Sequence, residues 1–514
     1  MRTKLSYFLF FLALIAMSFP SCSTQTKEAK TSSRPNIVFI MTDDHSYQTL
    51  SAYDDRYIQT PNLDRIANEG VIFKNSFVSN SICAPSRAVM LTGKHSHING
   101  QIDNFTTFDN TQPNFAKYLQ QAGYQTSLIG KWHLRSDPTG FDNWEILIGQ
   151  GNYYNSTFIE NGEKTPSKGY VTDVITDKAM QWLDGRKKDQ PFCLLVHHKA
   201  AHRIWQPNIT MLDSLSEKEY KVPANFFDNY EGRKAAKLNK MSIIKDMDLV
   251  YDLKMNDDAL PSKYRNAYKN MYNLMNPEQK EIWDAYYTPI LEQFKEAGLT
   301  DDELAIWKYQ RYMNDYLKVI RSLDDNVGRL LDYLDQNNLK ENTLVVYTSD
   351  QGFYMGEHGW FDKRYMYEQS LRTPLLMRYP EGIKNKGAIE ELVQNIDYAP
   401  TFLDFAGVDI PEDMQGASLK PLLNNEKMNW REAIYYHYYE SPNEHGVKKH
   451  YGIRTDRYKL IHFYEDMDEW EFYDLQKDPE EMHNLFHDEQ YSSLIKELKS
   501  KLEELQKQYK VTTY

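Results

Sequence analysis

The chain has 514 residues, of which 41% are hydrophobic and 26% charged, a composition typical of a globular protein with more than one domain. Its net charge of −13 argues against a nucleic-acid-binding protein, which would normally be basic, so we expect no nucleic-acid partner. An acidic average does not exclude an anionic substrate, because a local basic pocket can still hold one.

Residues 1–22 predict an export signal. A basic start precedes an apolar run at 7–17, which is too short to cross a bilayer as a helix. Cys22 resembles the processing site of a bacterial lipoprotein, so we expect export to the periplasm or cell envelope and a lipid anchor on Cys22. Ordinary cleavage nearby is the alternative. The polar residues 23–34 predict a flexible tether.

Four apolar runs predict strands of one sheet. A run that is apolar throughout is typical of a strand buried on both faces of a parallel sheet. Helical patterns lie between the runs, which implies crossover connections and an α/β fold, with a mostly parallel sheet flanked by helices. The runs are 36–41, 124–129, 190–196 and 342–348, and the helical patterns include 61–70 and 114–121.

The middle of the chain has a different texture. Residues 203–300 are rich in Lys, Asp, Asn, Tyr and Met, and predict an insertion of helices and loops beside the cleft. Residues 301–338 predict a long amphipathic helix or a broken pair of helices, because apolar residues recur three or four apart. We place both segments within a first domain of residues 35–425.

Residues 426–514 predict a smaller C-terminal α/β subdomain. Within it, 452–464 and 469–475 are expected to form two strands of an antiparallel sheet joined by an acidic turn. Residues 492–510 predict a charged closing helix.

One cysteine lies among small residues in the segment 79–93. Pro85 suits the first position of a helix, so Cys83 should lie just before a helix N-terminus. The free backbone N–H groups and the helix dipole there would lower the pKa of the thiol and favour an anion. Arg87, one turn further on, would add a positive charge on the same side. The alternative is a small cysteine buried behind a helix.

Polar side chains follow each predicted strand at its carboxyl end, where open parallel sheets bind their ligands. Three carboxylates brought together there cannot all stay ionised without a cation between them, and oxygen ligands suit Ca²⁺ or Mg²⁺. For the first two acids alone, a helix cap or a turn is the alternative. The residues concerned are Asp43 and Asp44, Lys131 and His133, His197, His198 and His202, and Asp350 and Gln351.

The pattern from Cys83 to Arg87, followed by Leu91-Thr92-Gly93, resembles the signature of the formylglycine-dependent sulfatases of the alkaline-phosphatase-like superfamily. The resemblance runs from about residue 35 to the C-terminus. It implies that Cys83 is oxidised to formylglycine, whose hydrate is the nucleophile, by a formylglycine-generating or anaerobic sulfatase-maturating enzyme. It also favours calcium over magnesium, with Asp43, Asp44, Cys83, Asp350 and Gln351 as the metal site. Gln351 is a departure, because many sulfatases have Asn or His there.

The same resemblance implies roles for the remaining candidates. Lys131 and Lys363 would clamp the sulfate oxygens, and Arg87 would hold the nucleophile and the carboxylates in place. His202 is the candidate general acid, and His133 the candidate base. Ala201 departs from the proline that commonly precedes this histidine, so His197 and His198 stay open as alternatives. A single lysine or histidine of this kind is more often a surface or packed residue.

Residues 351–380 resemble bacterial carbohydrate sulfatases, including enzymes that act on 6-sulfated N-acetylglucosamine and on ulvan. Asp362, Arg364 and His450 are sugar contacts by that likeness, and a structural role is equally open for each. We therefore expect a carbohydrate sulfatase that hydrolyses sulfate esters on a sulfated glycan. The alternatives are a phosphonate or phosphodiester hydrolase on the same scaffold and a non-catalytic sugar-binding homologue. With Cys22 and Cys83 both modified, no disulfide is expected.

Overall fold

The computed structural model describes residues 34–215 and 218–512. The predicted export signal, with Cys22, lies outside the described residues, as does the predicted tether up to residue 33. None of the described helices is long and apolar enough to cross a membrane. The chain from Arg34 onward forms one compact unit, and the domain boundary placed at residue 425 stays a prediction.

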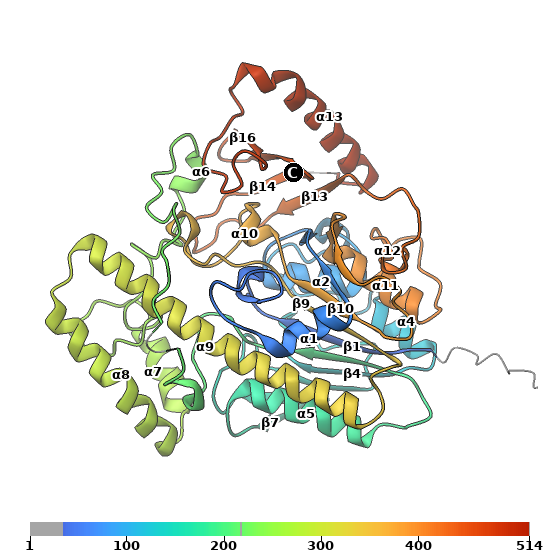
Figure 1. Cartoon of the computed structure of the whole chain (residues 1–514), viewed down its shortest axis with the longest axis horizontal. Coiled ribbons are helices and arrows are strands. Elements are labelled where there is room, and N and C mark those ends of the chain that lie inside the picture. Colours follow the sequence, from blue (N-terminus) through green and yellow to red (C-terminus); the bar gives the residue numbers. More distant parts are fainter. Residues whose placement is uncertain (1–33, 216–217, 513–514) are drawn as a thin grey trace, which may run out of the picture. The chain divides into compact units, whose positions relative to one another are not determined.

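A ten-stranded sheet forms the centre of this unit (Figure 1). Strand β1 (Asn36–Thr42) lies between β8 (Phe192–His197) and β9 (Thr343–Ser349), and pairs with both in parallel. Strands β4 (Gln125–Gly130) and β5 (Asn143–Leu147) extend the parallel part beyond β8. All four predicted strands are thus confirmed, and they are the buried core of the sheet.

Shorter strands complete both edges of the sheet. On one side β10 pairs antiparallel with β9 and with β2, and β11 pairs with β2 in parallel. On the other side β6 and β7 are antiparallel additions next to β5. The bounds are β2 Val71–Phe73, β6 Thr157–Glu160, β7 Glu163–Pro166, β10 Leu375–Arg378 and β11 Gly387–Ile389, and a separate pair joins β3 (Ser76–Phe77) to β12 (Val393–Gln394). The predicted mostly parallel α/β sheet is confirmed.

Alternation along β1 divides the core between the two faces of the sheet. Val38 and Ile40 pack into the cluster that includes the apolar stripe of α9, whereas Phe39 and its odd-numbered neighbours pack against α4 and α11. Helices on both faces therefore make every residue of β1 buried. The first face carries α1 (Pro61–Glu69), α5 (Val171–Gly185) and α9 (Asp301–Gln336), and the second α2 (Cys83–Thr92), α4 (Phe115–Gln121) and α11 (Tyr398–Phe405).

Residues 203–300, for which an insertion is predicted, hold helices joined by long loops, which lie around one end of α9 in Figure 1. Its helices are α6 (Lys234–Lys237), α7 (Arg265–Leu274) and α8 (Pro277–Ala297). Helix α9 is a single helix of 36 residues, which decides against the broken pair. A capping box between Thr300 and Glu303 starts it by satisfying backbone N–H groups of the first turn.

The C-terminal sheet differs from its prediction in one respect. The expected strand at 452–464 is a hairpin, formed by β14 (His450–Thr455) and β15 (Tyr458–Phe463). The backbone N–H of Tyr458 donates to Thr455 Oγ1 at 3.0 Å and closes the turn between them. The complete sheet runs β13 (Ala433–Tyr438), β14, β15 and β16 (Glu469–Asp474), all antiparallel, and α13 (Ser492–Gln508) packs on it as the predicted closing helix.

Candidate active site

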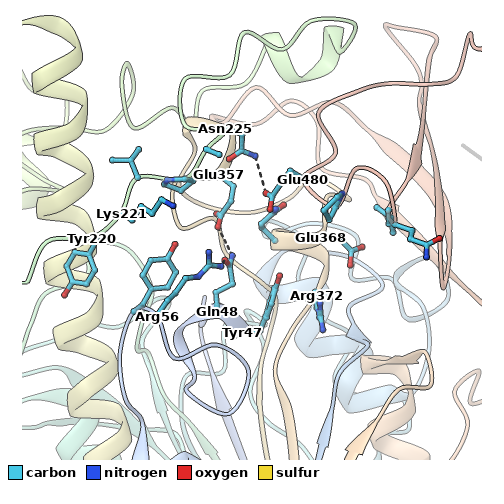
Figure 2. A pocket seen from close by; sticks show the side chains of 18 of the residues that line it. Tyr47, Gln48, Arg56, Tyr220, Lys221, Asn225, Glu357, Glu368, Arg372 and Glu480 are labelled. Atoms are coloured by element: carbon cyan, nitrogen blue, oxygen red, sulfur yellow. Dashed lines mark hydrogen bonds between the residues drawn. The ribbon is translucent and has the colours of Figure 1, made fainter.

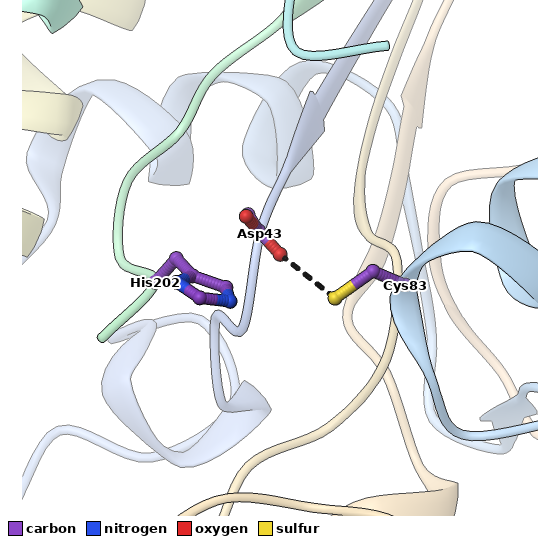
Figure 3. A group of neighbouring side chains, drawn as sticks. All are labelled: Asp43, Cys83 and His202. Carbon is purple, nitrogen blue, oxygen red and sulfur yellow. Dashed lines mark hydrogen bonds between the residues drawn. The ribbon is translucent and has the colours of Figure 1, made fainter. Parts of the chain in front are cut away.

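Three carboxylates and a thiol meet at the carboxyl ends of the central strands. Asp43 and Asp44 follow β1, Asp350 follows β9, and Cys83 opens α2. Oxygen atoms of the three acids lie within 4.8 Å of one another, as do ligand atoms of Asp43, Cys83 and His202. Figure 3 shows the imidazole of His202 and the thiol of Cys83 facing Asp43 from opposite sides. The sequence prediction that strand ends deliver one polar cluster is therefore met geometrically.

Cys83 is the first residue of α2, with Ile82 as the N-cap, and Pro85 is the third residue rather than the first. A proline is tolerated there because the first turn of a helix has no intrahelical use for its N–H groups. The expected lowering of the thiol pKa is wrong: burial raises the pKa of Cys83 to about 12, although Lys131 and Lys363 oppose the rise. Its Sγ lies 3.5 Å from Asp43 Oδ1.

Each carboxylate of the cluster faces its own buried cation. Lys131 pairs with Asp43, and Lys363 Nζ lies 2.6 Å from both oxygens of Asp44. The guanidinium of Arg87 donates to Asp350 Oδ2 from Nε at 3.0 Å and from Nη2 at 2.8 Å. These ion pairs are almost fully removed from water, so the cations are held at fixed positions around the cluster.

The donor set fits a divalent metal ion. Burial, together with the neighbouring carboxylates, raises the pKa of Asp44 to about 7, and burial and Asp43 raise that of Asp350 to about 6. Gln351 Oε1 is buried and has no hydrogen-bond partner among the described residues, while the amide nitrogen of the same side chain donates to Asp44. An oxygen acceptor with nothing to bind, beside three crowded carboxylates, is what a hard cation would satisfy.

The two candidate proton-transfer histidines lie at this cluster. His202 Nδ1 hydrogen-bonds to the backbone oxygen of Arg203 at 2.7 Å, which leaves Nε2 facing the site, 3.9 Å from Asp44 Oδ2. His133 has φ 61° and a buried Nδ1 with no partner among the described residues. Burial lowers the pKa of both imidazoles well below 6.5, and Asp43 opposes that shift in each.

His197 and His198, the alternatives to His202 as general acid, lie at the end of β8. They are outside the metal-ligand groups found among the described residues. His197 Nδ1 lies 3.2 Å from the backbone oxygen of Lys131, and burial lowers the pKa of His198 to about 3.

Lys199 went unrecognised as a site residue. It is buried, and burial lowers its pKa to about 7, with Lys131, Asp43 and Asp44 close enough to act on it. Its position at a strand end was the available signal.

The predicted sugar contacts divide into two kinds. Asp362 adjoins the cluster through Lys363 and pairs with Arg364. His450 is fully buried: its Nδ1 lies 2.8 Å from the backbone oxygen of Lys448, and its Nε2 accepts from the backbone N–H of Met366. Both ring nitrogens of His450 are thus used inside the protein, which favours a structural role over the predicted sugar contact.

Sequence reasoning missed His445. Its Nε2 lies 3.7 Å from Asp362 Oδ2 and 3.2 Å from Glu444 Oε1. The loop between β13 and β14 that carries His445 has no motif, so only the folded chain brings it to the wall of the site next to Asp362.

Comparisons with known proteins agree with this geometry. The family model described as Sulfatase matches residues 35–408, and that described as N-sulphoglucosamine sulphohydrolase, C-terminal, matches 356–508. The chain is 51% identical to an N-acetylglucosamine-6-O-sulfatase of Bacteroides thetaiotaomicron, over 97% of this chain and 90% of the relative. It is 24% identical to an ulvan-active sulfatase of Formosa agariphila, over 95% of this chain and 85% of the relative. A solved structure described as being in complex with its substrate D-glucosamine-2-N,6-O-disulfate superimposes with a TM-score of 0.91 at 51% identity, over 93% of this chain and 98% of that one.

Proposed function

The chain belongs to the sulfatase family, and we propose that it removes the 6-O-sulfate of N-acetylglucosamine or N-sulfated glucosamine in sulfated glycans. It is a sulfuric ester hydrolase that acts on carbohydrate, and its family generally uses a formylglycine nucleophile and a divalent metal. The observation that carries the choice of sugar is the 51% identity to the N-acetylglucosamine-6-O-sulfatase, against 24% to the ulvan-active enzyme.

The oxygen-rich cluster supports calcium as the metal. Asp43, Asp44, Asp350 and the unpartnered oxygen of Gln351 would hold the ion, next to the group derived from Cys83. A divalent cation bound there polarises a sulfate oxygen and supplies positive charge as negative charge grows on that oxygen in the transition state.

The lysines supply the rest of the positive charge. Lys131 and Lys363 reach the cluster from different segments of the chain and are held by buried acids, so little reorganisation is needed when a sulfate enters between them. Arg87 keeps Asp350 in place through two hydrogen bonds and also donates from Nη1 to the backbone oxygen of Lys131 at 2.9 Å. This coupling positions one sulfate clamp relative to the carboxylates.

Proton transfer falls to the two histidines. His202 would give a proton from Nε2 to the departing sugar oxygen, because an alkoxide leaves poorly without one. Since Nδ1 already holds its proton on the backbone oxygen of Arg203, the ring would act as the imidazolium, which Asp43 favours against the effect of burial. The hydrogen bond from Nδ1 to the backbone of Arg203 fixes the ring so that Nε2 faces the cluster. His133 would take the proton from the second hydroxyl of the nucleophile when sulfate is released, and burial keeps this imidazole neutral and ready to accept it.

Maturation and location complete the proposal. Cys83 requires a formylglycine-generating or anaerobic sulfatase-maturating enzyme as a transient partner, acting before the segment becomes buried. The export signal predicted at 1–22 supports a site of action in the periplasm or cell envelope, with a lipid anchor on Cys22.

The deciding experiment is sulfate release from a panel of defined saccharides by protein made with its maturation enzyme. The panel holds N-acetylglucosamine 6-sulfate, glucosamine N,6-disulfate, ulvan oligosaccharides and matched phosphate and phosphonate esters, with Cys83→Ala as the control. We expect release from the two glucosamine 6-sulfates, lost in the variant. Release only from ulvan would overturn the choice of sugar. Turnover only of the phosphorus esters, with formylglycine confirmed at position 83 by mass, would favour the phosphonate hydrolase. No turnover of any ester would favour the non-catalytic homologue.

A further inference from the structure

A second cavity, of about 910 Å³, is lined by none of the active-site residues described above. Its walls come from four regions far apart in the sequence: the loop after β1, the insertion at 219–225, the segment 357–372, and the C-terminal subdomain. Figure 2 shows it extending from Tyr220, next to α9, to Arg372. The volume is at the upper end of the range for pockets that hold organic ligands, roughly 300–1,000 Å³.

At one end of the cavity, cations gather around a single carboxylate. Glu368 is held by Arg454, at 3.3 Å from Nε and 3.2 Å from Nη2, and by Lys459 Nζ at 2.9 Å. Arg372 acts on the same carboxylate and lies at the same end. Lys459 also pairs with Glu481 at 2.7 Å. Three cations therefore surround Glu368 at this place in the cavity.

Hydrogen-bonding capacity at this end is not used by the protein. Arg372 Nε, Arg454 Nη1 and Gln369 Oε1 are buried side-chain atoms without a partner among the described residues. Arg454 and Gln369 are each at least nine-tenths buried, and their residues line the cavity. Buried polar atoms left unpaired are costly, so three of them in residues that line the cavity leave hydrogen-bonding capacity for a ligand or bound water.

Aromatic rings and acids define the rest of the cavity. The guanidinium of Arg372 lies 4.6 Å from the ring centre of Tyr47, so the positive end continues into an aromatic wall. Between Arg372 and Tyr220, Glu357 accepts from Gln48 Nε2 at 2.8 Å, and Glu480 accepts from Asn225 Nδ2 at 3.4 Å (Figure 2). A ligand with one anionic group and many hydroxyls would match this lining, with the anion at the arginines and the hydroxyls at the acids further along the cavity.

We propose that this cavity is a second saccharide-binding site, which takes a carboxylate- or sulfate-bearing sugar of the glycan with its anionic group at Arg372 and Arg454. The choice of a sugar rests on the proposed function, whereas the preference for an anion rests on the cavity alone. The site would hold the glycan chain at a place where no hydrolysis occurs and so raise the affinity for long substrates over monosaccharides.

The test measures binding by calorimetry to the full chain carrying Cys83→Ala, so that turnover plays no part. The probes are a sulfated hexasaccharide containing uronic acid and glucosamine 6-sulfate, its desulfated form, its carboxyl-reduced form, and inorganic sulfate. Arg372→Gln should weaken hexasaccharide binding at least about tenfold. Arg65→Gln is the matched control, because Arg65 lies outside the cavity and pairs with Asp332 and Asp335. Comparing the desulfated and carboxyl-reduced forms tells which anion the arginines hold.

A second variant tests the cavity independently, in case Arg372→Gln impairs folding. Ala224 is exposed and lines the cavity, so Ala224→Trp fills it without touching a charge and should weaken the same binding. In the matured enzyme both variants should raise KM for the hexasaccharide and leave kcat and KM for the monosaccharide sulfate unchanged. Unaltered hexasaccharide binding in both variants, or equal binding of the hexasaccharide after both desulfation and carboxyl reduction, would overturn the proposal. Binding is measured in Cys83→Ala protein, which does not turn over substrate, so a failed binding test counts against the cavity proposal alone. Loss of turnover with binding retained would instead count against the proposed function.

Discussion

Glu471 offers a direct test of how burial acts on this fold. The side chain lies on β16, fully buried, and its Oε2 accepts from the hydroxyls of Tyr367 and Tyr473, both at 2.8 Å. Its Oε1 has no partner among the described residues. Burial raises the pKa of this carboxyl from 4.5 to about 7, with the two tyrosines opposing the rise. The folded protein therefore holds a proton at Glu471 over a pH range in which the unfolded chain has already released it.

The sign and size of the effect follow from that difference. An acid whose pKa is raised on folding stabilises the fold at low pH, and this contribution is lost as the pH rises through the folded pKa. At about 1.4 kcal/mol for each pH unit, the range from 4.5 to about 7 gives a loss of roughly 3 kcal/mol. Glu471→Gln keeps an oxygen for the two tyrosines and cannot ionise, so the variant should not show this loss.

The assay is chemical denaturation of both proteins at several pH values between about 5 and 8. Other groups titrate in both proteins and cancel in the comparison. The unfolding free energy of the variant minus that of the wild type should rise by roughly 2.5 kcal/mol from the acid to the alkaline end, because the assay begins about half a pH unit above 4.5. Glu504→Gln, an exposed change on α13, is the control and should give a flat difference. A flat difference for Glu471→Gln as well would refute the reasoning.

Three further predictions concern the active site. In His202→Asn, kcat should fall by about 10²–10⁴ on sugar sulfates and much less on an aryl sulfate, whose leaving group needs no proton, and equal losses would argue against a general acid. Lys363→Met should lower kcat/KM by about 10²–10³ with the far-ultraviolet circular dichroism retained, whereas Lys363→Arg keeps part of the rate. The wild-type rate in the methionine variant would exclude Lys363 as a sulfate clamp. Removing metal with a chelator should abolish sulfate release, and Ca²⁺ should restore it better than Mg²⁺; full activity in protein shown by elemental analysis to be metal-free would contradict the proposed use of Asp43, Asp44 and Asp350.

Some features were predictable because their causes are local. Strands β1, β8 and β9 are continuous apolar runs, and a run of that kind is stable only where both faces of a sheet are covered. The carboxyl ends of parallel strands meet at one edge of the sheet, so Asp43 and Asp350 could be placed together although about three hundred residues separate them. The hairpin of β14 and β15 escaped prediction, because only the short polar run 454–457 lies at its turn and no glycine or proline marks the reversal.

The family, the parallel core and the residues that follow its strands could therefore be inferred from the sequence. The environments of those residues depend on the folded chain. The thiol pKa of Cys83 rises because the whole chain encloses it, an effect that outweighs the helix N-terminus visible in the sequence. His450 became a packed side chain and His445 a neighbour of Asp362, and the cavity at Arg372 formed, because loops from distant regions converge. Burial and pairing of this kind depend on every segment at once, so no local pattern records them.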